Sequence, residues 1–177
     1  ILIGQSHKYN LSHAAVYNKG SFLTPLGEVK INEALAEKII KSDKLIKADI
    51  QPHIEEHSLE VQLPFLQSVL KKFTMVPILV SGFNFKDCES IGKSLAKVLK
   101  DEKNVLIVIS TDMSHYPSYE DAKLIDNQIL KEIESLDPES VLNKDREIMS
   151  KGYKQESCTL CGLQAVVIGM ICLKELG

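Results

Sequence analysis

The sequence predicts a single α/β domain in which a mostly parallel or mixed central sheet is flanked by helices. Short strand-like apolar runs, such as Ile1–Ile3 and Val105–Ile109, alternate along the chain with segments of helical periodicity. This alternation is typical of a parallel sheet layered by helices. The 177 residues are enough to bury a core of their own, and no internal repeat or linker divides them.

Two helices are predicted in the first half of the chain. Apolar residues recur three and four positions apart over residues 31–40 and again over residues 59–73, which gives each segment one apolar face. Pro64 fits the second helix only in its first turns or at a kink, because proline lacks an amide hydrogen and clashes with the preceding turn.

Two further strands are predicted, with a helix between them. Residues 74–80 are rich in β-forming types but include Pro77, which predicts an edge strand or a bulge. The apolar spacing over residues 91–99 predicts a helix, and Val105–Ser110 reads as the next buried strand.

Three helices are predicted in the last third of the chain. A capping-box spacing at Ser118 opens the first of them. Asp137–Pro138 combines a capping side chain with a proline at the first helical position, so the second helix begins there, and Gly152 ends it. The last helix is expected to start just after Cys161–Gly162.

Composition limits the classes of partner. The net charge is −3, from 21 basic and 24 acidic residues spread along the chain, which argues against electrostatic binding to nucleic acid or membranes. A small-molecule substrate or a peptide fits better. The four cysteines are typical of free thiols in a reducing compartment, and no signal-like or membrane-spanning apolar run is present, so we predict a cytoplasmic protein.

Three histidines lie in loops that end a strand or open a helix, and they define the candidate site. His7 follows the first strand, His57 stands among Glu55, Glu56 and Ser58, and His115 follows the strand that ends near residue 110. Ligands of open α/β sheets gather where strands end. His7 is therefore a candidate metal ligand, although a hydrogen-bonded loop histidine is the alternative. The residues around His57 also fit a simple helix cap.

Asp112 and His115 are the strongest local signal for chemistry. A carboxylate and an imidazole three residues apart at a strand end can form an oriented acid/base pair. The alternative is an aspartate that only satisfies backbone amides of its turn.

The pair Cys158 and Cys161 forms a lone CxxC. A zinc ribbon would need a second pair, whereas a redox dithiol needs the motif at a helix amino end, which the last predicted helix offers. His13 and His53 have no organised neighbours in the sequence and are expected to be surface or packing residues.

Five segments together resemble the Memo-like family, which is protein B of the AmmeMemoRadiSam system in microbes. They match the family patterns G-P-S-H, T-P-L-G, E-H-S-[IL]-E-x-[HQ]-L-P-[FY], S-S-D-x-[ST]-H-[YW] and C-G in order and spacing. The matching residues are Gly4–His7, Thr24–Gly27, Glu56–Phe65, Ser110–Tyr116 and Cys161–Gly162. The resemblance covers essentially the whole chain.

The resemblance implies a fold similar to class III extradiol ring-cleaving dioxygenases, whose non-haem iron is held by two histidines and a carboxylate. In Memo-like proteins the corresponding ligands are a histidine of an upstream A-P-H-A-G segment, the G-P-S-H histidine, and a cysteine or acid near the carboxyl terminus. Of these, we expect only His7 here, in a single Memo-like domain over residues 1–177 that lacks the upstream segment and the final strands. By the same analogy His115 is the general acid/base, His57 a substrate contact and Asp112 the orienting partner.

Three hypotheses follow. The first is a metal-dependent oxidoreductase or dioxygenase-like protein that holds one iron or copper ion through His7, with His115, Asp112 and His57 in catalysis. Gln5 stands where the family has proline and Lys8 where it often has histidine, which changes the rim of the pocket but removes no ligand. The second hypothesis is a non-catalytic module that binds a peptide or an anion in the same cleft, and the third is a truncated domain without activity.

Overall fold

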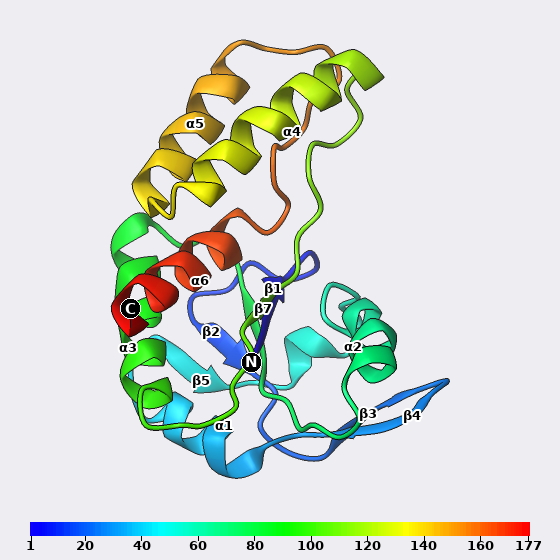
Figure 1. Ribbon diagram of the computed structural model, residues 1–177, viewed down its shortest axis with the longest axis vertical. Coiled ribbons are helices and arrows are strands. Elements are labelled where there is room, and N and C mark those ends of the chain that lie inside the picture. Colours follow the sequence, from blue (N-terminus) through cyan, green and yellow to red (C-terminus); the bar gives the residue numbers. More distant parts are fainter.

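A five-stranded sheet forms the centre of the computed structural model, which describes all 177 residues (Figure 1). Its strand order is β5-β2-β6-β1-β7. The strands are β1 (Leu2–Gln5), β2 (Ala14–Val16), β5 (Ile46–Ala48), β6 (Pro77–Val80) and β7 (Val108–Ile109). β1 runs parallel to β6 and to β7, β2 runs parallel to β5, and only the β2/β6 pair is antiparallel. The predicted mostly parallel α/β sheet is therefore confirmed.

Helices cover one face of the sheet, and a helix and a hairpin cover the other (Figure 1). The first face carries α1 (Glu33–Ile40), α3 (Phe85–Leu99) and α6 (Leu163–Leu176), and the second carries α2 (Leu63–Val69) with the hairpin β3 (Ser21–Thr24)–β4 (Gly27–Lys30). Alternation along β1 separates the two cores, because Ile3 packs into the first and Leu2 into the second. Burial on both faces explains why this strand reads as a continuous apolar run.

Side-chain caps fix the starts of four helices. Each capping oxygen accepts a hydrogen bond from a backbone amide two or three residues further on, at a position where the helix itself offers no acceptor. The caps are Asn32 of α1, Asn84 of α3, Ser118 of α4 (Tyr119–Glu134) and Asp137 of α5 (Pro138–Ser150). The starts predicted at Ser118 and Asp137 are confirmed.

The long helix predicted over residues 59–73 is wrong in its extent. The segment instead forms a 3-10 helix, Glu60–Gln62, and the two-turn helix α2, with Pro64 in its first turn. A second 3-10 helix spans Gln51–His53. The chain leaves the helical conformation at Leu70, so Phe73 reaches the core from a loop.

The edge position predicted from Pro77 is also wrong. β6 lies in the middle of the sheet between β2 and β1, and Pro77 is its first residue, where a missing amide hydrogen costs little. The strand predicted over Val105–Ser110 is shortened to β7, although the Val108 and Ser110 amides still donate to the carbonyl oxygens of Ile1 and Ile3.

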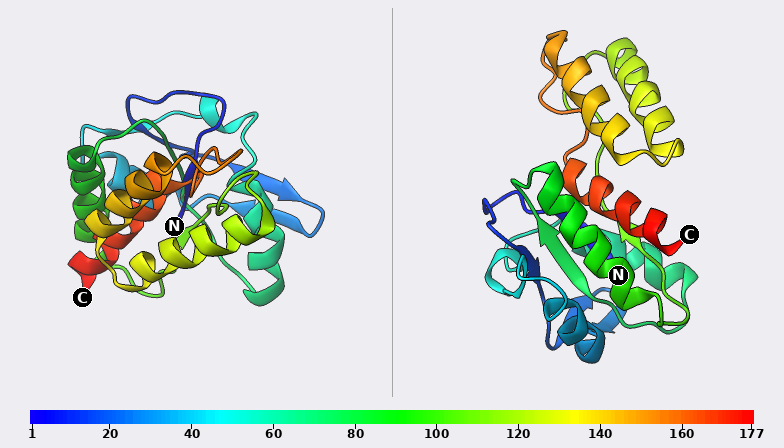
Figure 2. Two further views of the ribbon diagram at one scale, coloured as in Figure 1. Left: turned by 90° about the horizontal axis from the view of Figure 1, so that it is seen from above. Right: turned by 90° about the vertical axis from the view of Figure 1, so that its left-hand side faces the viewer.

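Helices α4 and α5 form an antiparallel pair that stands away from the sheet (Figure 2). We call this pair the α4–α5 arm. It has its own small core, in which Ile125, Ile129, Val141 and Ile148 pack against Val166 and Met170 of α6. The arm therefore packs mainly against α6, and Ile109 of β7 also borders its core.

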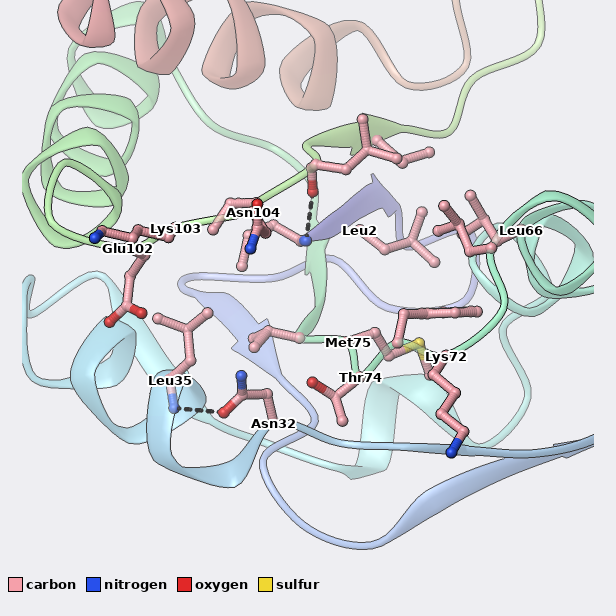
Figure 3. Close-up of a pocket in the computed structure, with 17 residues that line it drawn as sticks. Leu2, Asn32, Leu35, Leu66, Lys72, Thr74, Met75, Glu102, Lys103 and Asn104 are labelled. Carbon is pink, nitrogen blue, oxygen red and sulfur yellow. Dashed lines mark hydrogen bonds between the residues drawn. The ribbon is translucent and has the colours of Figure 1, made fainter.

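An apolar cavity of about 390 Å³ lies at the amino ends of β1 and β7 (Figure 3). Leu2, Leu35, Leu66 and Met75 are among the residues that line it. This is the opposite end of the sheet from the histidine loops. None of the helices has both the length and the apolar composition needed to cross a membrane.

Candidate functional site

The candidate site lies at the carboxyl ends of β1 and β7, two neighbouring parallel strands. His7 follows β1 by two residues, and the segment Ser110–His115 follows β7 directly. His57 comes from the loop that precedes the 3-10 helix Glu60–Gln62. In Figure 1 these strand ends face the α4–α5 arm.

Polar side chains fasten the three histidine loops to one another. Ser58 Oγ donates to the Gln5 carbonyl oxygen at 2.7 Å, and Ser110 Oγ donates to the Ser58 carbonyl oxygen at 2.5 Å. Gln62 Nε2 in turn donates to Ser110 Oγ at 3.0 Å. The three loops are therefore tied together at one edge of the sheet.

His7, Glu56 and His57 form the first group of possible metal ligands. Their ligand atoms all lie within 4.8 Å of one another. The imidazoles of His7 and His57 stack with ring centroids 4.9 Å apart, and Glu56 Oε1 lies 2.9 Å from His7 Nδ1 and 3.2 Å from His57 Nδ1. The Glu56 side chain is 1% exposed, against 33% for His7 and 62% for His57. A buried carboxylate thus supports two imidazoles that reach solvent.

Glu56 is ionised in this position. Burial on its own would raise the pKa of the carboxyl, but hydrogen bonds from the His7 amide and imidazole and from the Ser58 amide outweigh it and lower the pKa to about 2. The carboxylate therefore carries its negative charge beneath the two rings.

Asp112, His115 and Cys161 form the second group, again with ligand atoms within 4.8 Å of one another. The Asp112 amide donates to Cys161 Sγ at 3.1 Å, and the Cys161 amide donates to the Asp112 carbonyl oxygen at 3.3 Å. Asp112 is exposed, whereas His115 and Cys161 are half-buried. Cys161 thus joins the aspartate and the histidine that the sequence paired.

The ring of His115 is oriented by a backbone group. Its Nδ1 lies 2.8 Å from the Met113 carbonyl oxygen, and a carbonyl in that place requires Nδ1 to carry the proton. In the neutral ring this contact leaves Nε2 of His115 as the nitrogen without a hydrogen. Asp112 was expected to orient this ring, but the hydrogen bond of Nδ1 goes to the Met113 carbonyl oxygen.

A close approach of α6 to the end of β7 places Cys161. Gly162, the N-cap of α6, lies so near the strand end that a Cβ on it would be 2.7 Å from the Ser110 carbonyl oxygen and 2.9 Å from Thr111 Cβ. Its amide donates to Thr111 Oγ1 at 2.9 Å. Glycine is needed here because any side chain would push the two segments apart.

The other candidates from the sequence have structural surroundings. His13 Nε2 lies 3.0 Å from Asp49 Oδ2, and buried His53 lies 3.0 Å from the Ala15 carbonyl oxygen. Burial lowers the pKa of His53 to about 4, so it stays neutral. Cys158 and Cys161 do precede a helix, as a redox dithiol requires, but burial raises the pKa of the Cys158 thiol and disfavours its reactive thiolate.

Sequence reasoning missed two members of the site. In the sequence Glu56 fits a possible helix cap, and its signals are the position beside His57 and the E-H-S pattern that it opens. Cys161 fits a helix start and a CxxC pair, and its partner Asp112 lies 49 residues away. Both depend on contacts between segments far apart in the chain.

Comparisons with known proteins identify relatives of this chain. A family model described as "Memo-like protein" matches residues 1–177. A "MEMO1 family protein" of Aquifex aeolicus is 36% identical over 178 residues, covering 100% of this chain and 63% of the relative. Proteins of the same description from Methanobrevibacter smithii and Thermotoga petrophila are 33% and 32% identical, over 60% and 57% of their own lengths. The chain thus spans about three fifths of the length of these relatives.

Proposed function

Because the chain belongs to the Memo-like protein family, we propose that it acts as a metal-dependent, dioxygenase-like oxidoreductase with one iron or copper ion at the carboxyl ends of β1 and β7. The observation that carries this proposal is the arrangement of His7. Its Nδ1 is hydrogen-bonded to buried Glu56, so Nε2 of this partly exposed ring is left as the ligand atom. A carboxylate behind a ligating histidine is the usual arrangement of histidine metal sites.

The donor types at this edge suit iron or copper. Imidazole nitrogen binds iron, copper and zinc, and a cysteine thiolate adds a soft ligand that favours copper(I), zinc or iron. We assign His7 Nε2 to the ion. Cys161 Sγ, which lies with Asp112 and His115 in the second group, is the soft donor at the same strand ends, and Asp112 supplies an exposed carboxylate beside it. A bound iron or copper ion would supply one-electron redox chemistry and Lewis acidity.

The remaining residues would handle protons and position the substrate. His115 has Nδ1 fixed on the Met113 carbonyl oxygen, so its Nε2 is placed to accept a proton from a hydroxyl group of a substrate and to return it later. His57 presents an exposed ring stacked on His7, where it would contact a planar substrate. A small catechol-like molecule has the hydroxyl groups and the flat ring that these two histidines would meet.

Metal content tests the proposal. Protein loaded anaerobically with Fe(II) or Cu(I) and then desalted is expected to keep roughly one ion per chain. His7→Ala should lose it, whereas His13→Ala, which removes a histidine paired with Asp49 outside the site, should not. Equal metal content in His7→Ala and the unmodified protein would contradict the assignment.

Dioxygen uptake tests the chemistry. Loaded protein is expected to consume dioxygen with catechol-like compounds, and His115→Gln should keep the ion but lose the uptake. A protein that stays metal-free yet binds a peptide or an anion saturably would instead support the non-catalytic binding module.

A further inference from the structure

Glu56 accepts hydrogen bonds from an unusual number of donors. Its Oε2 accepts from the His7 amide at 2.5 Å, and its Oε1 accepts from the His7 imidazole and from the amides of His57 and Ser58, each at 2.9 Å. The side chain is 1% exposed, so water does not compete for these contacts. One carboxylate therefore binds the main chain and the ring of the same histidine.

These contacts define the protonation pattern of His7. Both oxygens of Glu56 accept hydrogen bonds from backbone amides, so the ring nitrogen that faces this carboxylate must be a donor as well. In the neutral ring of His7 the hydrogen is accordingly on Nδ1, and Nε2 keeps its lone pair. The amide contact to the other oxygen fixes the backbone from which the ring projects. Both the tautomer and the direction of Nε2 are thus set by one side chain.

Only a carboxylate matches this set of donors. Four N–H groups point at the Glu56 side chain, and a carboxylate has about four lone-pair positions and no hydrogen. In glutamine one oxygen becomes an NH₂ group. Placed at Oε2, the NH₂ would face the His7 amide; placed at Oε1, it would face Nδ1 and push the hydrogen of the ring to Nε2.

We propose that Glu56 is the positioning residue of the site and holds His7 in the Nδ1–H tautomer, with Nε2 left free as a ligand atom. That Nε2 binds a metal ion rests on the proposed function, whereas the tautomer does not. Its neighbour Glu55 is exposed and makes none of these contacts.

The test is the ¹⁵N spectrum of the histidine rings in metal-free protein, recorded well above the ordinary imidazole pKa of about 6.5. His7→Ala identifies the His7 signals. The unmodified protein is expected to show a protonated Nδ1 and a bare Nε2 on His7. Glu56→Gln should raise the Nε2–H population, and Glu55→Gln, the matched control, should leave the spectrum unchanged.

Metal affinity is the second readout. Glu56→Gln is expected to weaken Fe(II) or Cu(I) binding by roughly 10–100-fold, the usual effect of removing a carboxylate behind a ligating histidine. Glu56→Asp, which keeps the charge on a shorter arm, should weaken it less.

Three outcomes decide the proposal. An Nε2–H tautomer in the unmodified protein overturns it, whether or not any variant folds. An unchanged tautomer and unchanged affinity in folded Glu56→Gln also overturn it. A shifted tautomer in Glu56→Gln supports it even if no variant and no unmodified protein binds metal, in which case only the proposed function fails.

Discussion

Replacing Gly162 by alanine tests the contact that brings Cys161 to the end of β7. The added Cβ would lie 2.7 Å from the Ser110 carbonyl oxygen, about 0.7 Å closer than ordinary contact allows. Because that oxygen belongs to the backbone, α6 and the strand end must separate. A separation of that size would lengthen the contact of the Asp112 amide with Cys161 Sγ from 3.1 Å to about 3.8 Å and weaken this hydrogen bond.

The expected loss of stability is about 2–3 kcal/mol. Overpacking contributes about 1–3 kcal/mol, and each weakened hydrogen bond contributes about 1 kcal/mol. The smaller entropy of alanine in the unfolded chain offsets about 0.4–1 kcal/mol. Urea unfolding followed by circular dichroism measures the difference.

Gly152→Ala is the matched control. A Cβ on Gly152 meets nothing within 4 Å, but its φ of +65° is unfavourable for alanine, so this variant should lose about 1 kcal/mol without touching the site. Only Gly162→Ala should also bind iron or copper more weakly. If Gly162→Ala is as stable as the unmodified protein and binds metal equally well, the contact does not position Cys161 as argued.

Three further predictions concern the fold. The pKa of buried His53 is lowered by burial to about 4, below its unfolded value of about 6.5. The contribution of neutral His53 to the free energy of unfolding is therefore fully present above pH 6.5, and up to about 3 kcal/mol of it is lost as the pH drops to 4. His53→Gln should flatten this pH dependence in unfolding titrations. Gly92→Ala would place a Cβ 2.7 Å from Ile171 Cγ2 between α3 and α6. The free energy of unfolding should fall by about 1–2 kcal/mol despite the better helix propensity of alanine, and a lower Tm would report this loss. Asn84→Ala removes the cap of α3 and should cost about 1 kcal/mol in urea unfolding; an unchanged midpoint would mean that the cap contributes nothing.

Local signals in the sequence were reliable where the physics is local. The caps at Ser118 and Asp137 and the helix before residue 100 depend on neighbours within a few residues, and the structure confirms them. The sheet was harder to read. β2 spans only Ala14–Val16, which is too short to show the two-residue hydrophobic alternation of a strand. The central place of Pro77 depends on which strands pair with β6 and not on the residues of β6 itself.

For the site, too, the local features could be predicted and the long-range contacts could not. The ends of two predicted strands indicate where His7 and His115 lie, because the carboxyl ends of parallel strands share an edge, whereas His57 comes from a loop before a 3-10 helix. The partners of these rings could not be predicted, since Glu56 meets His7 across 49 residues and Met113 replaces Asp112 as the acceptor for His115. A side chain that caps a loop and one that anchors an imidazole look alike until the chain is folded.

The α4–α5 arm is joined to the body by two connections, and both carry donor groups of the site. The outgoing connection holds Asp112 and His115, and the returning one holds Cys158 and Cys161. Backbone hydrogen bonds join the two, from His115 to Cys158 and from Cys161 to Asp112. The thiol and the imidazole are therefore held near each other at the base of the arm by contacts between the two connections, and not by any strand of the sheet. The distance between those donor atoms therefore depends on the position of α4 and α5, two helices that stand away from the sheet.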